Sequence, residues 1–336
     1  MSRDRPTEYS GAASSPLRIG FQVWGQYVDW TELMEVGRRI DALGFDGLWS
    51  NDHLLPVAGG GDEALEIEQG PVWDGWMTLM GWAALTSTVS LGCLVSGVGY
   101  RNPTLLVKMA TALDHASDGR AVLGLGAGWH AAEHRAFGFS YPSLGERLDR
   151  LEEAALISRQ MLDGEAATLD GRWLTADAVR NEPPPLQERL PLLIGGSGEK
   201  RTLPIVARTA DIWNGEGDPA TYARKSALLD ELCRSVGREP ADVGRTVGLP
   251  PPLIRADRSE AVETLAQSLV RHGTDAGVAL AAAQASPLVG PLEQVTERLR
   301  EYVVAGVQEV MFDWPTPSDE ETLEALAGPI RGALDA

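Results

Sequence analysis

Short apolar runs alternate with longer amphipathic segments along almost the whole chain. The runs have strand length and contain few polar residues, as in residues 120–126 and 308–314, a pattern typical of parallel strands that are buried on both faces. The longer segments repeat apolar residues every three or four positions, as helices packed on a sheet do. We predict strands at residues 18–24, 46–52, 89–96, 120–126, 190–194, 210–214, 246–254 and 308–314.

The segments between these strands carry helix start and stop signals. Thr31 is a plausible N-cap and Gly44 a stop for the first helix, and Asn102 followed by Pro103 begins the third. Helices are predicted at residues 31–43, 74–86, 102–116, 145–162, 199–209, 219–236, 259–272, 291–305 and 320–334. The order is therefore eight strand–helix pairs, which indicates βαβ units and a parallel sheet.

Two architectures contain such a sheet, and the glycine pattern separates them. A doubly wound open sheet carries G-x-G-x-x-G after its first strand, and residues 21–25 contain no such turn. We therefore predict the α/β fold of a (β/α)8 TIM barrel, as one domain over residues 17–336, preceded by a disordered tail at residues 1–16. The chain exceeds the typical barrel length of about 250 residues, which leaves room for loop insertions at the C-terminal face. Residues 54–71 and 273–290 are the two long connections and are lid candidates.

The net charge of the chain disfavours nucleic acid and membrane surfaces as partners. The formal net charge is −19, and a field of that sign repels nucleic acid and anionic lipid. No apolar run approaches the roughly 20 residues of a membrane span, and the N-terminus has no apolar core like that of a signal peptide. We expect a cytoplasmic protein that acts on a small molecule. Cys93 and Cys233 lie in apolar contexts and are expected to be buried free thiols.

Aromatic residues gather where the predicted strands end, which is the face where barrel enzymes place their chemistry. Indole rings at a barrel mouth suit a flat heteroaromatic ligand, although large aromatics also fill core space elsewhere. The residues in question are Trp24, Trp129, Trp213 and Trp314, with Trp49 just before this set.

Small residues at two strand ends allow close approach to a ligand. Gly195, Gly196, Ser197 and Gly198 follow the fifth strand and open a helix, so their backbone N–H groups can bind a phosphate. A tight turn that needs glycine for its geometry is the alternative. The run from Ser96 through Gly97 and Val98 to Gly99 interrupts the third strand and indicates a bulge or a ligand contact.

Histidines offer proton transfer or metal binding. His53 ends the second strand and is a candidate proton donor, while a histidine held by loop hydrogen bonds is the commoner case. Residues 130–134 match the zinc-peptidase pattern H-x-x-E-H, which needs both histidines on one helix and a third ligand. The pattern directly follows a strand, and we expect no metal. The chain has no Walker A motif, no G-x-S-x-G and no C-x-x-C.

Several of these segments together resemble one protein family. The strings RIGFQVWG, DGLWSNDHL, LGCLVSGVGYRNP, AVLGLGAGWHAAEHRAFG, PLLIGGSGEKRTLPIVARTADIWN and VMFDWP are similar to those of the bacterial luciferase-like superfamily. Its branch that uses the deazaflavin coenzyme F420 is the most similar. The resemblance covers residues 17–334 and implies a (β/α)8 barrel with a flavin or deazaflavin at its C-terminal mouth, commonly in a homodimer.

The resemblance also assigns roles to individual residues. Asp52 and His53 match ring-contacting positions, with His53 as a proton donor. The segment Ser96–Gly99 matches the part that backs the ring, where family members often have a non-prolyl cis peptide, so Gly97–Val98 is the candidate bond. Ala127 and Gly128, next to Trp129, match further ring and ribityl contacts. The phosphate loop is matched by Gly195, Gly196 and Gly198, with Ser197 between them.

One position departs from the family pattern. Members that oxidise sugar phosphates carry a glutamate base where this chain has Trp129, and Glu133 lies a turn further on. The resemblance therefore favours F420-dependent reduction of an activated C=C or C=N bond over oxidation of glucose 6-phosphate. An FMN-dependent monooxygenase that uses reduced FMN and oxygen is the alternative.

Overall fold

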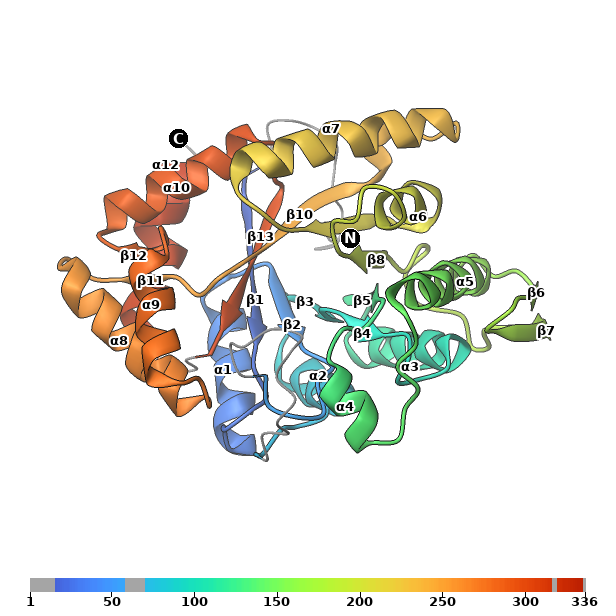
Figure 1. The fold of residues 1–336 in the computed structure, drawn as a ribbon, viewed down its shortest axis with the longest axis horizontal. Helices are drawn as coiled ribbons and strands as arrows, with labels where there is room; N and C mark the ends of the chain where they lie inside the picture. Colours follow the sequence, from blue (N-terminus) through green and yellow to red (C-terminus); the bar gives the residue numbers. More distant parts are fainter. Residues whose placement is uncertain (1–15, 58–69, 316–318, 335–336) are drawn as a thin grey trace.

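The computed structural model describes residues 16–57, 70–315 and 319–334, and the predicted tail at residues 1–16 lies almost wholly outside them. Eight parallel strands form the centre of the molecule, and helices surround them (Figure 1). These strands are β1 (Arg18–Val23), β2 (Gly47–Ser50), β3 (Ser90–Cys93), β5 (Ala121–Gly126), β8 (Leu192–Gly195), β9 (Ile212–Gly215), β10 (Gly244–Leu249) and β13 (Glu309–Trp314).

The sheet closes on itself. Its order is β3-β2-β1-β13-β10-β9-β8-β5, and β5 pairs back with β3, with Leu91 opposite Ala121. A cluster of buried side chains from five different strands fills the interior, as layers of branched and large residues do in barrels of this kind. Its members are Trp49, Val122, Leu193, Ile212 and Met311. The predicted (β/α)8 TIM barrel is therefore confirmed.

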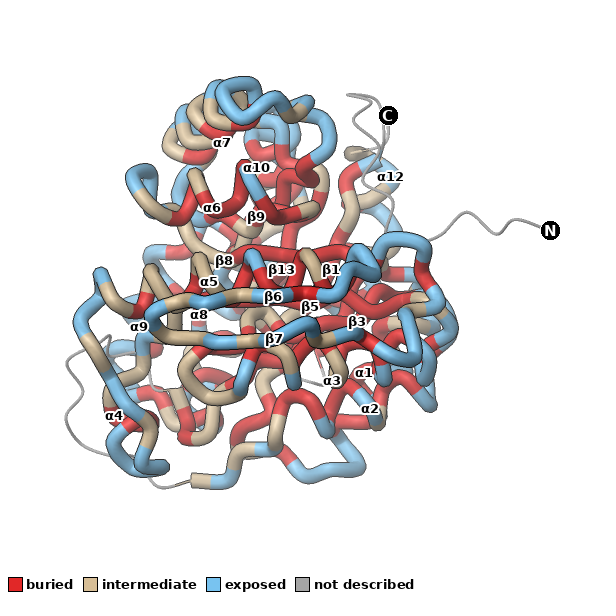
Figure 2. Tube along the Cα trace, turned by 90° about the vertical axis from the view of Figure 1, so that its right-hand side faces the viewer, coloured by how far each residue is buried: buried red, intermediate tan, exposed pale blue. Residues whose placement is uncertain are grey.

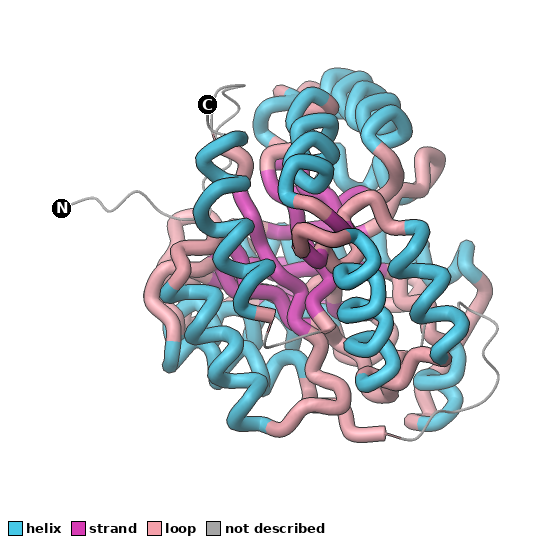
Figure 3. Tube along the Cα trace, turned by 90° about the vertical axis from the view of Figure 1, so that its left-hand side faces the viewer, coloured by secondary structure: helices cyan, strands magenta, loops and turns pink. Residues whose placement is uncertain are grey.

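The helices lie outside the barrel, and buried residues line their inner sides and the strands (Figures 2 and 3). Among the described residues, no helix has the length and apolarity that crossing a membrane requires. Cys93 and Cys233 are buried free thiols, as predicted. The helices are α1 (Trp30–Ala42), α2 (Gly75–Leu85), α3 (Pro103–Ala116), α4 (Ala131–Ala136), α5 (Leu144–Leu162), α6 (Thr202–Thr209), α7 (Pro219–Ser235), α8 (Arg258–Arg271), α9 (Ala276–Ala285), α10 (Leu292–Val304), α11 (Glu320–Ala325) and α12 (Arg331–Leu334).

Caps explain where several helices begin. The Asn102 side chain accepts a hydrogen bond from the Thr104 N–H, and α3 starts at Pro103, as predicted. The first helix begins earlier than predicted because Asp29, not Thr31, is its N-cap and accepts a hydrogen bond from the Glu32 N–H at 2.9 Å.

Two parts of the chain differ from the sequence prediction. Residues 273–290 were expected to form a long loop, but they contain α9 and the short strand β12 (Val289–Gly290), which pairs with β11 (Leu253–Ile254). Alanines on α9 pack with α8 into a separate apolar cluster, so this insertion is a packed helical pair. A hairpin of β6 (Ala167–Asp170) and β7 (Thr175–Val179) was not predicted. The other lid candidate, residues 54–71, lies largely outside the described residues.

The cis peptide is also elsewhere than predicted. Leu94–Val95 is cis, and Gly97–Val98 is not. Gly97 belongs to the short strand β4 (Ser96–Gly97), which is paired in regular parallel register with β5, and the Val98 N–H donates to the Gly126 carbonyl at 3.0 Å. The cis bond therefore lies just before the segment Ser96–Gly99 that the resemblance indicated, in the connection between β3 and β4.

Candidate active site

A cavity of about 870 Å³ opens at the carboxyl ends of the barrel strands. Residues at or just after the carboxyl ends of the eight strands of the ring line it, so it occupies the face where barrel enzymes carry their active sites. Nine of the thirteen sequence-predicted site residues lie in its wall: Asp52, His53, Gly97, Ala127, Gly128, Trp129, Gly195, Gly196 and Gly198.

The other four predicted residues are not among the cavity-lining residues. Ser96 is fully buried, and its hydroxyl accepts a hydrogen bond from Trp76 Nε1 at 2.9 Å, on the side of α2. Val98 is buried. A Cβ on Gly99 would lie 3.0 Å from His134 Nε2. The Ser197 hydroxyl accepts a hydrogen bond from the Glu216 N–H at 3.1 Å. These residues support the cavity wall from behind.

Asp52 is held by an arginine that the sequence analysis did not single out. Arg101 Nη1 lies 2.6 Å from both Asp52 carboxylate oxygens, and its Nη2 lies 2.7 Å from Asp74, the N-cap of α2. Burial raises the pKa of Asp52, and the charge of Arg101 partly opposes this. The ion pair thus fixes the segment after β2 to the start of α2. In the sequence, Asn102-Pro103 predicted the start of the following helix, but no motif indicated a role for Arg101.

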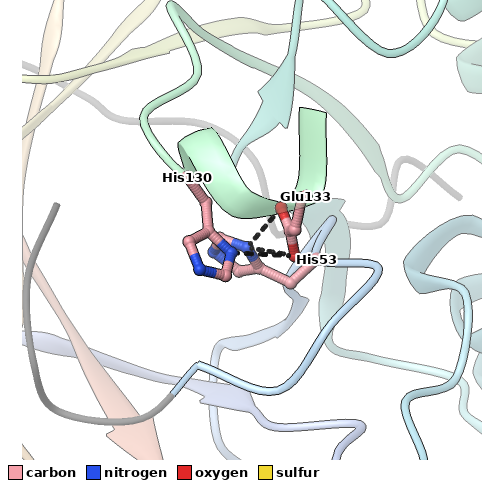
Figure 4. Close-up of side chains that lie close together, drawn as sticks. All are labelled: His53, His130 and Glu133. Atoms are coloured by element: carbon pink, nitrogen blue, oxygen red, sulfur yellow. Dashed lines mark hydrogen bonds and ion pairs between the residues drawn. The ribbon is translucent and has the colours of Figure 1, made fainter. Parts of the chain in front are cut away.

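His53 follows β2 and contacts a buried glutamate (Figure 4). Its Nδ1 lies 3.1 Å from both carboxylate oxygens of Glu133, which comes from α4. The His53 ring also meets the Trp129 indole edge to face, with ring centres 5.3 Å apart. His53 is therefore not a solvated loop histidine. It is a cavity residue whose ring is held on one nitrogen.

Glu133 has a dense set of donors around its carboxylate. Oε1 accepts hydrogen bonds from the Leu54 and Leu55 N–H groups at 2.7 and 3.0 Å, and Oε2 accepts one from the Tyr100 hydroxyl at 2.5 Å. The side chain is fully buried. Although burial by itself raises the pKa of Glu133, the nearby His130 and His53 imidazoles and the Tyr100 hydroxyl outweigh it and hold the pKa well below its usual range. Glu133 is therefore ionised and can only accept hydrogen bonds.

The zinc pattern does not come together as that motif requires. His134 Nδ1 donates to the His130 carbonyl at 3.0 Å, and its ring packs against Tyr100, away from His130 Nδ1. The groups that do converge within 4.8 Å of one another are His53, His130 and Glu133. Because backbone and tyrosine donors already occupy the Glu133 oxygens, little acceptor capacity remains for a metal ion.

The loop after β8 presents backbone to the cavity. Gly196 adopts a positive φ of +119°, and a Cβ on Gly198 would lie 2.9 Å from Thr202 Oγ1. The Trp213 indole donates to the Gly196 carbonyl at 2.9 Å and holds the loop in place. Within the described chain, the N–H groups of Ser197 and Gly198 donate to no protein acceptor. Free N–H groups before a helix suit a phosphate.

Arg201, which follows this loop, is paired with residues of another element. The sequence predicts a helix from residue 199, but α6 begins at Thr202. Arg201 forms ion pairs with Asp149 and Glu152 on α5, at 2.5 and 3.4 Å. Arg201 is thus engaged with α5, and the loop presents backbone N–H groups to the cavity.

The indoles divide into two groups. Trp24 and Trp129 line the cavity, whereas Trp49, Trp213 and Trp314 are fully buried and contribute to the core. For these three the alternative left open by the sequence, that large aromatic residues fill core space, is the one the structure shows.

Asp313, near the end of β13, lines the cavity, and the lining residues among those described include no lysine or arginine. Burial raises its pKa to about 6, and a hydrogen bond from Trp24 only partly offsets this effect. A buried carboxylic acid that titrates in this range is a common feature of active sites. Its position at a strand end was visible in the sequence, but its desolvation was not.

Comparisons with known proteins agree with this geometry. A family model described as luciferase-like monooxygenase matches residues 10–309. An F420-dependent glucose-6-phosphate dehydrogenase of Microbacterium testaceum is 30% identical over 68% of this chain and 66% of its own length. A protein of the same name from Kineococcus radiotolerans is 28% identical over 96% of this chain and 89% of its own.

A solved structure shows the same fold. It is that of an F420-dependent secondary alcohol dehydrogenase in complex with an F420–acetone adduct, and it superposes with a TM-score of 0.77 at 18% identity. The superposition covers 94% of this chain and 99% of that one. With a family model matching nearly its whole length, and with a barrel whose mouth carries the expected cavity, the chain belongs to the luciferase-like monooxygenase family.

Proposed function

We propose that this protein is an F420-dependent oxidoreductase that transfers hydride between the deazaflavin and a small organic substrate. The observation that supports the proposal is the cavity itself, whose wall includes both a glycine loop that exposes backbone and a histidine held by a carboxylate. The names of the two curated relatives point to the same cofactor.

The wall of the cavity fits a flat tricyclic ring. A Cβ on Gly126 or Gly195 would lie 2.4 or 3.0 Å from the Val95 side chain, so only glycine leaves these surfaces open. The volume of about 870 Å³ is at the upper end of the range of ligand pockets, enough for a ring and a small substrate together. Gly97, Ala127 and Gly128 would border the ring, and the loop from Gly195 to Gly198 would hold the phosphate.

A proton must accompany the hydride. The bound deazaflavin supplies or takes the hydride, and His53 donates or accepts the proton on the substrate side. His53 lines the cavity and its Nδ1 is engaged with Glu133, which leaves Nε2 for the exchange. Trp129 packs against the His53 ring and limits its movement.

The charge of the cavity bears on the substrate. None of its described lining residues is lysine or arginine, and the ionisable ones include Glu216 and Asp313. Residues 58–69 contain four acids and no lysine or arginine either. Once the glycine loop holds the cofactor phosphate, no cation remains for a sugar phosphate. We therefore favour reduction of an activated C=C or C=N bond in an uncharged or cationic substrate.

The test is a cofactor-linked assay with two arms. Reduced F420 is mixed with a panel of enones and cyclic imines, and oxidised F420 with glucose 6-phosphate. We expect reoxidation of the cofactor with at least one member of the panel and none of its reduction by the sugar phosphate. Turnover of glucose 6-phosphate alone would overturn the substrate proposal and leave the cofactor proposal intact.

An FMN-dependent monooxygenase is the second candidate, because the matching family model carries that description and FMN shares the ring shape and phosphate that this cavity would hold. It predicts oxygen consumption that requires both reduced FMN and an organic substrate. No oxygen uptake across the same panel would remove it.

We also propose that the protein is a cytoplasmic homodimer that pairs through the outer face of α2. Gly75–Leu85 contains no charged residue, and Met77 and Met80 are 55% and 37% exposed. Two copies that each carry a formal charge of −19 repel one another least where a surface is uncharged. Light scattering should report a dimer that dissociates in Met77→Glu/Met80→Glu but not in Leu280→Glu, where the replaced apolar residue is exposed on α9.

A further inference from the structure

We propose that Glu133 is a positioning residue that fixes the His53 imidazole, with Nδ1–H bound to the carboxylate and Nε2 turned to the substrate. The proposal rests on the proposed function, because it matters only if His53 exchanges a proton. Glu133 itself is not among the residues that line the cavity and would act only through His53.

The carboxylate is fixed before it meets the histidine. Backbone N–H groups of Leu54 and Leu55 donate to Oε1, and the Tyr100 hydroxyl donates to Oε2. Leu54 and Leu55 directly follow His53 in the chain, so Glu133 binds both the histidine ring and the backbone that carries it. Any displacement of the ring would break several of these hydrogen bonds at once.

The charge of the carboxylate decides the tautomer of His53. An ionised carboxylate has no proton to donate, so the Nδ1 atom 3.1 Å from both oxygens must carry the hydrogen. Neutral His53 then has its lone pair on Nε2, and the imidazolium has its exchangeable proton there. Nδ1–H stays bound in both states, as in carboxylate–histidine pairs that orient a catalytic imidazole.

His130 is close but does not replace this arrangement. Its Nδ1 lies 3.3 Å from Glu133 Oε1, yet it forms no well-directed hydrogen bond in the described structure. The short contacts from the segment after β2 therefore dominate the surroundings of Glu133. A purely structural role, in which Glu133 pins only the loop, is the competing account.

The decisive variant is Glu133→Gln. Its amide keeps the shape and one acceptor oxygen, but its NH₂ group faces Nδ1 and favours the opposite tautomer, with hydrogen on Nε2. The corresponding Asp→Asn change in a serine-protease triad lowers kcat by about 10⁴ through the wrong tautomer. We expect a loss in kcat of roughly 10²-fold or more, with the Kd for F420 changed by less than about threefold.

The matched control is Glu153→Gln. The Glu153 carboxylate also pins a loop, through the N–H groups of Arg172, Trp173 and Leu174, but it contacts no histidine. If pinning a loop were the whole role of Glu133, both variants would affect thermal stability alone. We expect kcat to stay unchanged in Glu153→Gln, whatever its effect on the melting temperature.

Nitrogen-15 NMR of the wild-type protein determines the tautomer of His53 directly, without an activity assay. The chain has five histidines, and the spectrum of His53→Ala identifies the signal of His53. The proposal requires a protonated Nδ1 and, at high pH, an unprotonated Nε2. A neutral His53 with its hydrogen on Nε2 overturns the proposal even if Glu133→Gln cannot be folded.

The outcomes distinguish a failure of proton exchange at His53 from a failure of the positioning role of Glu133. Full activity of His53→Ala would refute proton exchange at His53 and, with it, the proposed mechanism. Loss of activity in His53→Ala together with wild-type kcat in Glu133→Gln would refute only the role of Glu133. A large loss in both, with the tautomer reversed in Glu133→Gln, supports the positioning role.

Discussion

One end of the cavity is lined mainly by polar side chains and the other mainly by backbone. On the side of β2 and α4, side chains predominate, and their carboxylates are held by hydrogen-bond and ion-pair partners: several donors for Glu133, and Arg101 for Asp52. At the loop after β8, the wall is bare backbone kept open by glycine. In the proposed function, the first arrangement would hold a group that moves a proton in a fixed geometry, whereas the second would admit a phosphate through backbone N–H groups.

This difference predicts that substitutions at the two ends have different effects on turnover and on cofactor binding. Changes on the side-chain end should lower turnover while leaving cofactor affinity largely intact. Changes at the glycine loop should weaken cofactor binding and spare turnover at saturation. Asp313 belongs to neither end. A substitution there should change the pH dependence of stability, because burial raises the pKa of its carboxyl group.

The largest effect is expected for His53→Ala. Loss of a positioned acid or base costs roughly 10²- to 10⁴-fold in rate, and the Kd for F420 should change by less than about threefold. Steady-state kinetics and a fluorescence titration of the same preparation measure both quantities. Equal losses in kcat and affinity would make His53 a structural residue and remove the contrast.

Asp313→Asn should raise stability in a pH-dependent way. The folded-state pKa of Asp313 is raised to about 6 from 3.8, so ionising the folded protein costs stability that builds up as pH rises from about 4 to 6. The shift of about 2 units corresponds to roughly 3 kcal/mol at pH 7 and above. Asparagine avoids this cost, so the gain in melting temperature should be absent near pH 4 and full at pH 8.

The control for this prediction is Asp170→Asn on the exposed strand β6. Its effect on the melting temperature should be small and flat across the same pH range. A flat profile for Asp313→Asn as well would show that the carboxyl group is solvated in the cofactor-free protein.

Gly196→Val should weaken F420 binding by about tenfold or more, equivalent to about 1.4 kcal/mol, with little change in kcat at saturation. Valine both strains a backbone at φ +119° and adds bulk beside the N–H groups of the loop. Gly164→Val is the matched control, since its φ is +80° and no atom lies within 4 Å of its Cβ position. An unchanged Kd in Gly196→Val would argue against a phosphate at this loop.

The smallest effect is expected from metal removal. Because donors already surround the Glu133 carboxylate, treatment with a chelator should change neither the melting temperature nor the activity, and metal analysis should find sub-stoichiometric zinc. Stoichiometric zinc bound near His53 and His130 would mean that the side-chain end is a metal centre and not a proton-transfer site.

The repeating pattern of apolar strands and amphipathic helices was enough to predict the barrel, because the closed ring buries each strand on both faces. The same pattern located the strand ends, and most predicted site residues line the cavity. It could not show side-chain direction, so it left open whether an indole such as Trp213 or Trp314 faces the cavity or the core, and both are buried in the core.

The residues that complete the site were harder to predict because their partners are distant in sequence. Glu133 meets His53 across 80 positions, and Arg101 meets Asp52 across 49. The sequence showed Glu133 as part of a zinc pattern and as the carboxylate one turn beyond Trp129, and neither observation indicated that its carboxylate contacts His53. The pKa of Asp313 depends on burial that no local motif reports.

The identity of the cofactor is the central claim, and one experiment tests it directly. Purified protein is titrated with F420 and with FMN side by side, under the same conditions, by fluorescence. The account predicts saturable binding of F420 and much weaker binding of FMN. Tight binding of FMN with no response to F420 would contradict it.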